Sequence, residues 1–473
     1  MNSILRSSLL QNVRALMNLS EPTGSRGAVV MEEQHDSRSK LQCEFEQDVK
    51  AYLLQYPDTK HVDIYLNDIN GIFRGKRIDV SELRSIAKGC YFPQSVYSMD
   101  REGKVLCRAT DTLVVDEPDR LCLPVKGTLR PAAYAPRENA QLLLTMQDDD
   151  GVPYALEPRV ILENVLRRFH HHGLYPVIAP EIEFYIIDQQ MAEEIRGQGC
   201  FHMTVPSTYT PFIECLEEMA SIQNLSLTGI VSEAEPGQFE LNLKHSHQVV
   251  EICENVLALR RLTSIVASDF GYKASFMAKP FSLMAGNGLH FHISLNDVHG
   301  SNVFAAQPGE LNEMTRLCLA GLLHLMPASL AIMAPGVNSF RRIRKNLYEP
   351  LFSSWGYNKR SAALRIPCST KENSRIEYRL AGADANPYLV MATILTGMLY
   401  GLENIDDDIL ENIIHVAPPL PLFQQQAIEA FQESPYLMES LGKEFSQHWV
   451  HSRLEELTFF ESIVTPEESV YSC

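Results

Sequence analysis

Residues 179–188 read Ala-Pro-Glu-Ile-Glu-Phe-Tyr-Ile-Ile-Asp, and this stretch decides the fold of the chain. Successive side chains of a β-strand point to opposite faces, so Glu181 and Glu183 share one face while Ile182 and Phe184 share the other. Such a strand holds two carboxylates side by side. The sequence therefore predicts a strand with one apolar face and one face whose carboxylates could bind a ligand or take part in a reaction.

Three later stretches repeat this alternation. The residues on their polar faces are Gln238, Glu240 and Asn242; His290, His292 and Ser294; and Arg375, Glu377 and Arg379. An antiparallel strand with its polar face in water would show the same pattern. These faces, however, carry mainly Glu, His and Arg, whereas a solvated face usually carries Lys, Thr and Ser.

If the four strands are neighbours, several carboxylates and a histidine converge. Like charges that close together require a bound cation or raised pKa values. Oxygen ligands with one imidazole suit Mg²⁺ or Mn²⁺ better than Zn²⁺. The neighbouring arginines would then face phosphate or carboxylate groups. The first hypothesis from the residues is therefore a metal and phosphate site.

The bulk composition excludes several classes of protein. A chain of 473 residues is too long for one ordinary core, so we expect two domains. The net charge of −18 argues against a general nucleic-acid binder and against binding to an anionic membrane. The ten cysteines include no CxxC pair, which favours reduced thiols in a cytoplasmic protein. We find no apolar run approaching the roughly 18 residues of a membrane span.

The chain divides into three parts by pattern. Residues 1–40 are expected to be a disordered tail, although the first 20 weakly resemble a transit peptide. Residues 41–150 contain a hairpin signal around Asn70-Gly71 and more short strands, which predicts a small β-rich domain. Residues 151–473 alternate strands with helices, an α+β pattern. Helical spacing predicts helices over residues 41–56, 158–172, 211–220, 249–267, 311–325 and 387–400.

Two loops lie close in sequence to the strands that carry Glu, His and Arg on their polar faces. Ala285-Gly286-Asn287-Gly288 precedes a strand, so it is not a dinucleotide fingerprint, and the chain has no Walker A motif. Residues 338–346 are basic, and Arg360 and Arg365 follow soon after. In a chain of this net charge, such a concentration of arginine favours an anion site.

Six motifs in sequence resemble those of glutamine synthetases, in the family's order, within about residues 60–400. They are Glu181-x-Glu183, Glu233 with Pro236-Gly237-Gln238-x-Glu240, Gly286-Asn287-Gly288-Leu289-His290-x-His292, Asn338-Ser339 with Arg341-Arg342, Asn358-Lys359-Arg360-Ser361 to Arg365-Ile366-Pro367, and Arg375-Ile376-Glu377-Tyr378-Arg379 with Ala385-Asn386-Pro387-Tyr388. Four further stretches look like the γ-glutamylputrescine synthetase branch: Gly89–Pro93, Phe276–Pro280, Ser354–Gly356 and Ala381–Asp384.

The resemblance implies a fold and an assembly. It implies a small β-grasp-like N-terminal domain and a catalytic domain whose antiparallel strands form a bifunnel covered by helices. It also implies a homo-oligomer, typically a dodecamer of two hexameric rings with sites at subunit interfaces. The implied substrates are glutamate, ATP and an amine.

Residue roles follow from the resemblance, motif by motif. One metal would be held by Glu183, Glu233 and Glu240, and the other by Glu181, His290 and Glu377. Glutamate would be bound by Gly286, Arg342 and Arg379, and the nucleotide by His292, Ser294, Arg360, Arg365 and Arg375. The catalytic groups would be Arg360, Arg379 and Glu349.

The residues and the resemblance agree on the chemistry. A carboxylate does not react with an amine at neutral pH because its leaving group is poor. ATP would convert the γ-carboxylate of glutamate into an acyl phosphate, while metals and arginines stabilise the developing charge. The amine would then attack in its neutral form, so a base or water must take a proton.

Two departures from the family bear on the amine. True glutamine synthetases have Asp-Gly-Ser-Ser where this chain has Pro93-Gln94-Ser95 after Phe92, and the lost Asp helps to bind ammonium. The family's flap glutamate aligns with Tyr348 when positions are counted back from Pro350, although Glu349 is adjacent. The tyrosyl adenylylation motif is also missing. These departures indicate that ammonia is not the acceptor.

Four hypotheses of function remain. The first is a γ-glutamylpolyamine synthetase acting on putrescine or a longer polyamine in polyamine catabolism, with Glu349 and Asp100 available for the distal ammonium. The second is a γ-glutamyl ligase for a monoamine such as ethanolamine, an alkylamine or an aromatic amine. The third is a true glutamine synthetase. The fourth is an inactive structural protein of the same fold, which retention of all six metal ligands disfavours.

Overall fold

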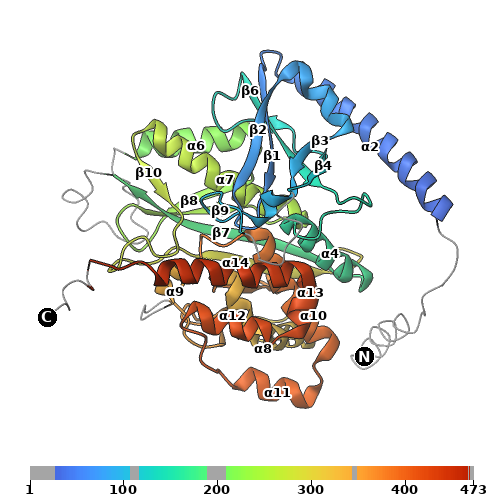
Figure 1. Cartoon of the computed structure of the whole chain (residues 1–473). Helices are drawn as coiled ribbons and strands as arrows, with labels where there is room; N and C mark the ends of the chain where they lie inside the picture. The colour runs from blue at the N-terminus through green and yellow to red at the C-terminus, as the bar shows by residue number, and fades with distance from the viewer. Residues whose placement is uncertain (1–26, 107–116, 189–208, 344–348, 467, 469–473) are drawn as a thin grey trace.

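The structure, a computed structural model, describes residues 27–466 and 468, except 107–116, 189–208 and 344–348 (Figure 1). The first part contains α2 (Gly27–Gln55), β1 (His61–Asn67), β2 (Phe73–Asp79), the 3₁₀ helix η1 (Val80–Lys88), β3 (Cys90–Pro93), η2 (Gln94–Ser98), β4 (Asp119–Pro124), β5 (Arg130–Pro131) and β6 (Asn139–Met146). The second part contains α4 (Pro158–His171), β7 (Tyr175–Ile187), α6 (Thr210–Ile222), β8 (Leu227–Ser232), β9 (Gln238–Leu243), α7 (Val249–Asp269), β10 (Lys273–Ser275), β11 (Leu289–Asn296), α8 (Glu313–Met333), α9 (Val337–Arg342), β12 (Trp355–Tyr357), β13 (Leu364–Ile366), η3 (Lys371–Asn373), β14 (Ile376–Tyr378), α10 (Pro387–Asn404), α11 (Asp407–His415), α12 (Gln424–Gln432), α13 (Pro435–Leu441) and α14 (Lys443–Glu461).

The first part folds into a six-stranded sheet in the order β2-β1-β6-β4-β3, with β5 paired to β6. The predicted hairpin is confirmed, since β1 and β2 pair antiparallel from Asn67↔Phe73 outward. Gly71 has a φ of +76°, which glycine adopts without strain in this turn. The parallel pairing of β1 with β6 could not be predicted from local alternation.

The second sheet brings the four chemistry-bearing strands together. Its order is β12-β13-β14-β11-β7-β9-β8, with β10 paired to β7, so β14, β11, β7 and β9 are consecutive. All these pairings are antiparallel except β12 with β13. In Figure 1 this sheet lies below the first one, and α8 and α10–α13 lie beneath it.

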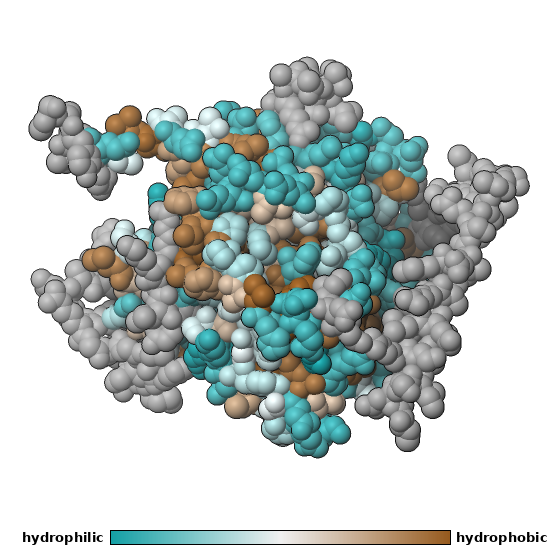
Figure 2. Space-filling view, turned by 90° about the horizontal axis from the view of Figure 1, so that it is seen from below, coloured by the Kyte–Doolittle hydropathy of each residue, from teal (hydrophilic) through white to brown (hydrophobic). Residues whose placement is uncertain are grey.

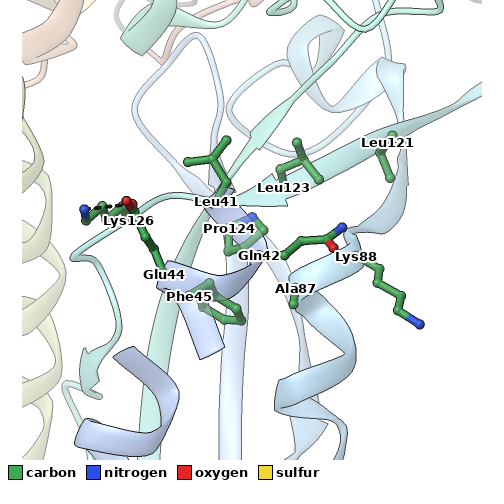
Figure 3. A pocket seen from close by; sticks show the side chains of 10 residues that line it. All are labelled: Leu41, Gln42, Glu44, Phe45, Ala87, Lys88, Leu121, Leu123, Pro124 and Lys126. Carbon is green, nitrogen blue, oxygen red and sulfur yellow. Dashed lines mark hydrogen bonds and ion pairs between the residues drawn. The ribbon is translucent and has the colours of Figure 1, made fainter. Parts of the chain in front are cut away.

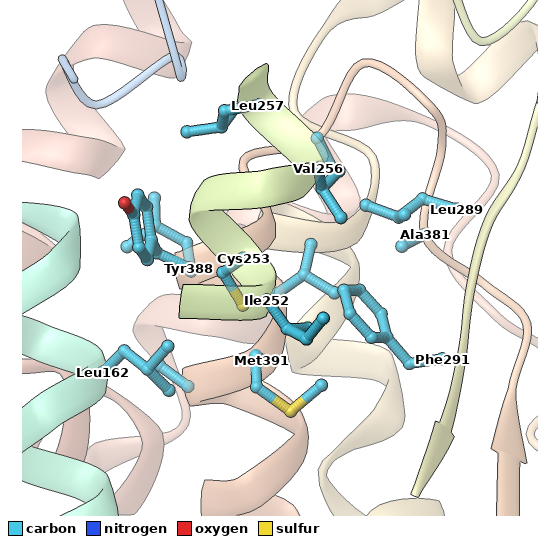
Figure 4. Close-up of a cluster of buried hydrophobic side chains, with 14 of the residues drawn as sticks. Leu162, Ile252, Cys253, Val256, Leu257, Leu289, Phe291, Ala381, Tyr388 and Met391 are labelled. Atoms are coloured by element: carbon cyan, nitrogen blue, oxygen red, sulfur yellow. The ribbon is translucent and has the colours of Figure 1, made fainter. Parts of the chain in front are cut away.

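The apolar faces of these strands fix the orientation of the polar faces. Ile182 and Phe184 of β7 and Phe291 of β11 are fully buried. Figure 4 shows Phe291 beside Ile252 and Met391, which come from α7 and α10. Because one-residue slippage would move every side chain to the opposite face, this packing also sets the register of the acids.

Helix α8 is longer than the sequence predicted. The predicted helix over 311–325 continues to Met333 with Pro327 inside it. By length and composition α8 could cross a membrane, but 78% of its apolar window is buried within the protein. It packs closely on α10, since a Cβ at Gly321 would lie 2.1 Å from the carbonyl oxygen of Gly397. We therefore interpret α8 as a core helix.

Apart from α8, the largest difference at the end of a predicted element is at the N-terminus. The predicted helix over 41–56 begins at Gly27, so residues 27–40 of the expected tail are helical, while residues 1–26 lie outside the described part. The expected boundary at Asp148–Gly151 falls in the connection between β6 and α4 and remains a prediction. Four further helices, α11–α14, follow α10 toward the C-terminus.

A pocket lies between α2 and β4, away from the polar face of the second sheet (Figure 3). Leu41 and Phe45 face Leu121 and Leu123 across it, and the Lys126–Glu44 ion pair of 2.8 Å lies at its side. Its lining is mostly apolar and brings no acids together. This pocket is therefore not the candidate site.

Candidate metal and substrate site

The candidate site is on the polar face of the second sheet. His290 of β11 lies opposite Glu181 of β7, and Glu183 of β7 lies opposite Glu240 of β9. Ligand atoms of Glu181, His290 and Glu377 lie within 4.8 Å of one another. The same holds for Glu183, Glu240 and His290. Two overlapping groups of possible metal ligands therefore share one imidazole.

The structure places one predicted ligand differently. The set of Glu181, His290 and Glu377 is together, as the resemblance implied. In the second set, His290 stands with Glu183 and Glu240, and Glu233 is outside the group. Glu233 follows β8, and its charge raises the pKa values of Glu183 and Glu240, so it lies near them.

The pKa values of the acids show strong mutual repulsion. Burial and the charges of Glu181, Glu183 and Glu233 raise the pKa of Glu240 to about 9. Burial and the charge of Glu233 raise the pKa of Glu183 to about 7, against the nearby Arg342. Burial also raises the pKa of Glu233. A divalent cation would remove this repulsion, since it favours the ionised form of each carboxylate.

The donor set fits Mg²⁺ or Mn²⁺. Burial, followed by the charges of Arg379 and Arg342, lowers the pKa of His290 well below its usual range, so the imidazole is neutral. A neutral imidazole can bind a metal, and the remaining donors are carboxylate oxygens. The residues present therefore match the metals expected from the sequence.

Glu377 is held between two arginines. Arg365 Nη1 donates to Glu377 Oε2 at 2.7 Å, and Arg379 Nη1 donates to Glu377 Oε1. Although burial opposes the effect, Arg379, His292 and Arg365 hold the pKa of Glu377 below its usual value. Glu377 is thus ionised and ready to bind a cation, while both arginines stand beside it.

His292 links Arg375 to the candidate metal ligand Glu181. Arg375 Nε donates to His292 Nδ1 at 3.1 Å, and His292 Nε2 lies 3.0 Å from Glu181 Oε1. Because arginine only donates, Nδ1 is the acceptor and the hydrogen of His292 is on Nε2. Ser294 is on the same face of β11, and Arg360 is exposed near Glu233.

The glycine-rich loop packs against Arg342. Arg342 is 2% exposed and donates to the carbonyl oxygens of Leu380 at 3.0 Å and Arg379 at 3.3 Å. A Cβ at Gly286 would lie 2.7 Å from Arg342 Cγ. Only glycine permits this approach, so the loop and the guanidinium form one wall of the site.

Gly288→Ala should disable the site without unfolding the protein. A Cβ there would lie 2.6 Å from His290 Nε2 and 2.8 Å from Arg342 Nη2, displacing a metal ligand and a guanidinium. Because displacements of about 1 Å can cost a hundredfold in rate, we expect kcat/KM for ATP turnover to fall about a hundredfold. Gly229→Ala in β8 is the control, since nothing lies within 4 Å of its Cβ. Equal activity of the two variants would contradict this placement of the loop.

The hydrogen bonds that support the glycine-rich loop and its surroundings were not predicted. Gln238 Nε2 donates to Gly286 O at 2.9 Å and Asn287 Oδ1 at 3.1 Å, and Glu235 accepts from the Ala285 amide at 3.1 Å. The backbone of Lys279 makes two hydrogen bonds of 2.9 Å with the Asn338 side chain. Gln238 was visible on a polar strand face, whereas no local signal connects Lys279 with Asn338.

Of the two acids expected to bind the distal ammonium, Glu349 lies in the site and Asp100 lies in a turn. Glu349 reaches the site, where its Oε2 lies 3.0 Å from Arg342 Nη2. Asp100 Oδ1 instead accepts from the amides of Glu102 at 2.9 Å and Lys104 at 2.8 Å, as in a turn. Tyr348 lies outside the described residues.

Comparison with known proteins agrees with this fold. Residues 155–471 match the model of the glutamine synthetase catalytic domain. The chain is 42% identical over 442 residues to the γ-glutamylputrescine synthetase of Escherichia coli strain K12, covering 90% of this chain and 94% of that protein. It is 28% identical over 424 residues to a glutamate–isopropylamine ligase of Pseudomonas sp, covering 84% and 91%. The chain therefore belongs to the glutamine synthetase family.

Solved structures share the fold at lower identity. Glutamine synthetase from Plasmodium falciparum has a TM-score of 0.78 at 17% identity, covering 96% of this chain and 100% of that one. The structure titled "Apo GmaS without ligand" has a TM-score of 0.76 at 23% identity, covering 89% and 98%. The α+β fold expected from the sequence is thus confirmed.

Proposed function

We propose that the protein is an ATP-dependent ligase that joins the γ-carboxylate of glutamate to an amine through a γ-glutamyl phosphate. The observation that carries the proposal is the site itself: two groups of possible metal ligands lie beside Arg365 and Arg379. The likeness to a γ-glutamylputrescine synthetase over 90% of the chain supports the same reaction class.

One group of residues in the site would bind glutamate, and a second group would bind ATP. Arg342 and Arg379, with the Gly286 loop, would hold the carboxylates of glutamate. Arg360, Arg365 and Arg375 would face the phosphates of ATP, with His292 and Ser294 beside the nucleotide. Bound at the two groups, Mg²⁺ or Mn²⁺ would neutralise phosphate oxygens as the phosphoryl group moves.

These arginines would supply positive charge where the γ-carboxylate attacks the phosphate. In the structure Arg365 and Arg379 pair with Glu377. Arg375 donates a hydrogen bond to His292. Arg365 and Arg379 share Glu377, so both guanidinium groups are held beside a candidate metal ligand. Fixed guanidinium groups stabilise developing negative charge without reorganisation at the moment of reaction. The proposal thus assigns the catalytic role to Arg360 and Arg379.

The acceptor that we propose is a polyamine, with putrescine first. Pro93 begins the segment that would bind ammonium in a true glutamine synthetase, and Gln94 of that segment is buried and accepts from Arg120 Nε at 3.1 Å. Glu349 supplies a carboxylate within the site for a cationic amine. A monoamine ligase is the second candidate, and the likeness to a glutamate–isopropylamine ligase favours it.

The test is the release of ADP by the purified chain with Mg²⁺ or Mn²⁺, ATP and glutamate, measured with a panel of amines. Putrescine and spermidine should give the highest kcat/KM, because a distal ammonium adds a charged contact worth about tenfold. Ammonium, ethanolamine, isopropylamine and benzylamine are the comparison. If monoamines gave the same kcat/KM as putrescine and spermidine, the result would favour the monoamine ligase. Preference for ammonium would contradict both candidates.

We further propose a cytoplasmic homo-oligomer of two hexameric rings. The seven described cysteines are all free, in agreement with a reducing compartment. Large apolar side chains are exposed at the end of α14 and near α12: Phe459, Phe460, Val464, Val416 and Phe423. Apolar and hydrophilic residues are mixed on the face of Figure 2, which views the chain from below. Exposed apolar groups of this kind support burial in subunit interfaces.

A further inference from the structure

Two free thiols lie opposite each other on strands β3 and β4 of the first sheet. Cys90 and Cys122 are direct partners in this antiparallel pair, and neither is in a disulfide. Side chains at directly opposite positions point to the same face of a sheet, and their Cα atoms are about 4.5 or 5.5 Å apart. A disulfide requires Cα atoms about 4.4–6.8 Å apart. The strand register therefore already meets the main geometric condition for a bond between these two residues.

The start of β3 lies very close to β4. A Cβ at Gly89 would be 2.6 Å from Leu121 Cδ1 and 2.8 Å from the carbonyl oxygen of Cys122. Gly89 has a φ of +91°, which glycine adopts without strain. In the described sheet β3 is an edge strand, and such a strand can shift more easily than one paired on both sides. The backbone leading to Cys90 is thus held against Cys122, and β3 can make the small movement that bond formation requires.

The two thiols differ in exposure, which gives a reaction at this pair an order. Cys122 is fully buried in the main apolar core, and Cys90 packs against that core but is partly exposed. Burial raises the pKa of both thiols, and the charge of Cys90 adds to the effect on Cys122, so the two groups are near each other. A small disulfide in solution would therefore meet Cys90 first.

The other described cysteines lie on separate elements. They are Cys43 on α2, Cys215 on α6, Cys253 on α7, Cys318 on α8 and Cys368 between β13 and η3. Among the strand pairings of the described residues, the β3–β4 pair is the one that places two cysteines opposite each other. The fold therefore selects one pairing, and the exposed Cys368 can serve as a control.

We propose that Cys90 and Cys122 form a redox modification site, at which a low-molecular-weight disulfide such as glutathione disulfide reversibly fastens β3 to β4. Cytoplasmic disulfides are usually transient, so the bond would form when the ratio of disulfide to thiol rises and break when it falls.

The reaction is two successive thiol–disulfide exchanges. The Cys90 thiolate attacks one sulfur of glutathione disulfide, whose S–S bond breaks and releases one glutathione thiolate. The Cys122 thiolate then attacks Cys90 Sγ in the mixed disulfide and releases the second. The two released thiolates take up the two protons that the cysteines lose. Two cysteines are thereby oxidised, and one glutathione disulfide is reduced to two thiols.

The first test maps the bond in the folded, full chain. Reduced protein is incubated with glutathione disulfide at about pH 8.5, alkylated, digested without reductant and analysed by mass spectrometry. The peptide pair joined through Cys90 and Cys122 should be at least about tenfold more abundant than any other cross-link, because the register raises their effective concentration. Dithiothreitol should remove it, and unfolding in urea before oxidation should abolish the preference. If Cys90 stays free or carries only glutathione, the proposal is wrong.

Variants separate the two exchanges. Cys122→Ala should stop the reaction at the mixed disulfide of Cys90 with glutathione, because the second thiol is missing. Cys90→Ser should leave the buried Cys122 unmodified. Cys368→Ser is the control, and its yield of the Cys90–Cys122 bond should stay within about twofold of the natural protein. Modification of Cys122 in the Cys90→Ser protein would contradict the order in which the thiols react.

The second test measures whether the bond fastens β3. Hydrogen–deuterium exchange is compared before and after oxidation in peptides that contain β3. Oxidation should slow exchange of the β3 amides at least about threefold, and dithiothreitol should restore it. In Cys90→Ser, glutathione disulfide should leave the exchange unchanged. Unchanged or faster exchange in the oxidised natural protein would overturn the fastening of β3. Neither test uses turnover, so both are independent of the ligase reaction proposed above.

Discussion

Replacing Glu240 with glutamine should stabilise the metal-free protein and nearly abolish its activity. Glu240 is 9% exposed, and the charges of Glu181, Glu183 and Glu233 add to the effect of burial on its pKa. The amide keeps the shape of the side chain and its oxygen but removes the repulsion. We expect the free energy of unfolding in EDTA at pH 8 to rise by about 1–3 kcal/mol, and kcat to fall at least about a hundredfold because one metal ligand is lost.

The sign of the pH effect follows from the raised pKa. Between the ordinary value of 4.5 and the folded value of about 9, the folded protein holds a proton on Glu240 that the unfolded chain has released. The stability of the metal-free protein should therefore decrease as the pH rises through this range. Added Mg²⁺ or Mn²⁺ should reverse the decrease, since binding the ionised carboxylates releases protons.

Thermal unfolding from pH 5 to pH 9, with EDTA or with metal, checks both statements. Glu138→Gln is the control, because that side chain is exposed and pairs with Lys60 at the surface, so its effect should be under about 0.5 kcal/mol. Destabilisation of the metal-free protein by Glu240→Gln would show that the acids do not repel one another in the folded chain.

Replacing Arg379 with alanine should damage both stability and catalysis. Arg379 is 7% exposed and pairs with Glu377, which is 1% exposed. Removing one partner of a buried pair leaves an uncompensated charge and costs about 3–5 kcal/mol. The retained Arg365–Glu377 contact will reduce this cost toward the lower value. Loss of a charge-stabilising donor should also lower kcat/KM about a hundred- to a thousandfold.

Arg379→Lys separates charge from geometry. Lysine keeps the charge but lacks the planar fork, so we expect most of the stability to return while kcat/KM stays at least about tenfold low. Arg316→Ala is the control, because Arg316 forms an exposed pair with Glu411, worth under about 1 kcal/mol. Chemical denaturation and steady-state kinetics provide the readouts. Full activity of Arg379→Ala would exclude Arg379 from the reaction.

The elements carrying the site could be predicted because their signals are local. Alternation of apolar and polar residues predicted β7, β9, β11 and β14, and the alternating burial along β7 confirms it. The convergence of Glu, His and Arg on one face was sufficient to predict a metal and phosphate site. Their adjacency in the sheet could not be derived in the same way, because strand order depends on pairings between segments far apart in the sequence, such as β7 with β11.

The details that were not predicted are all non-local. Nothing near Glu349 in the sequence indicates that its carboxylate reaches Arg342, since that contact depends on the path of the chain after α9. Glu233 was placed among the metal ligands by motif, whereas the structure groups His290 with Glu183 and Glu240. The pairing of Glu377 with two arginines also required the register of β13 on β14. Local patterns thus predicted which side chains share a strand face. The contacts between those side chains depend on segments that are distant in the sequence.

The most direct test of the account follows the oxygen atoms of glutamate. The purified chain is given ATP, Mg²⁺, putrescine and glutamate labelled with ¹⁸O in the γ-carboxylate, and the phosphate is analysed by mass spectrometry. If the carboxylate attacks ATP and the amine then displaces phosphate, each phosphate released should carry one ¹⁸O atom, and γ-glutamylputrescine should form in equal amount with ADP. Unlabelled phosphate would mean that no γ-glutamyl phosphate forms, and it would contradict the proposed function.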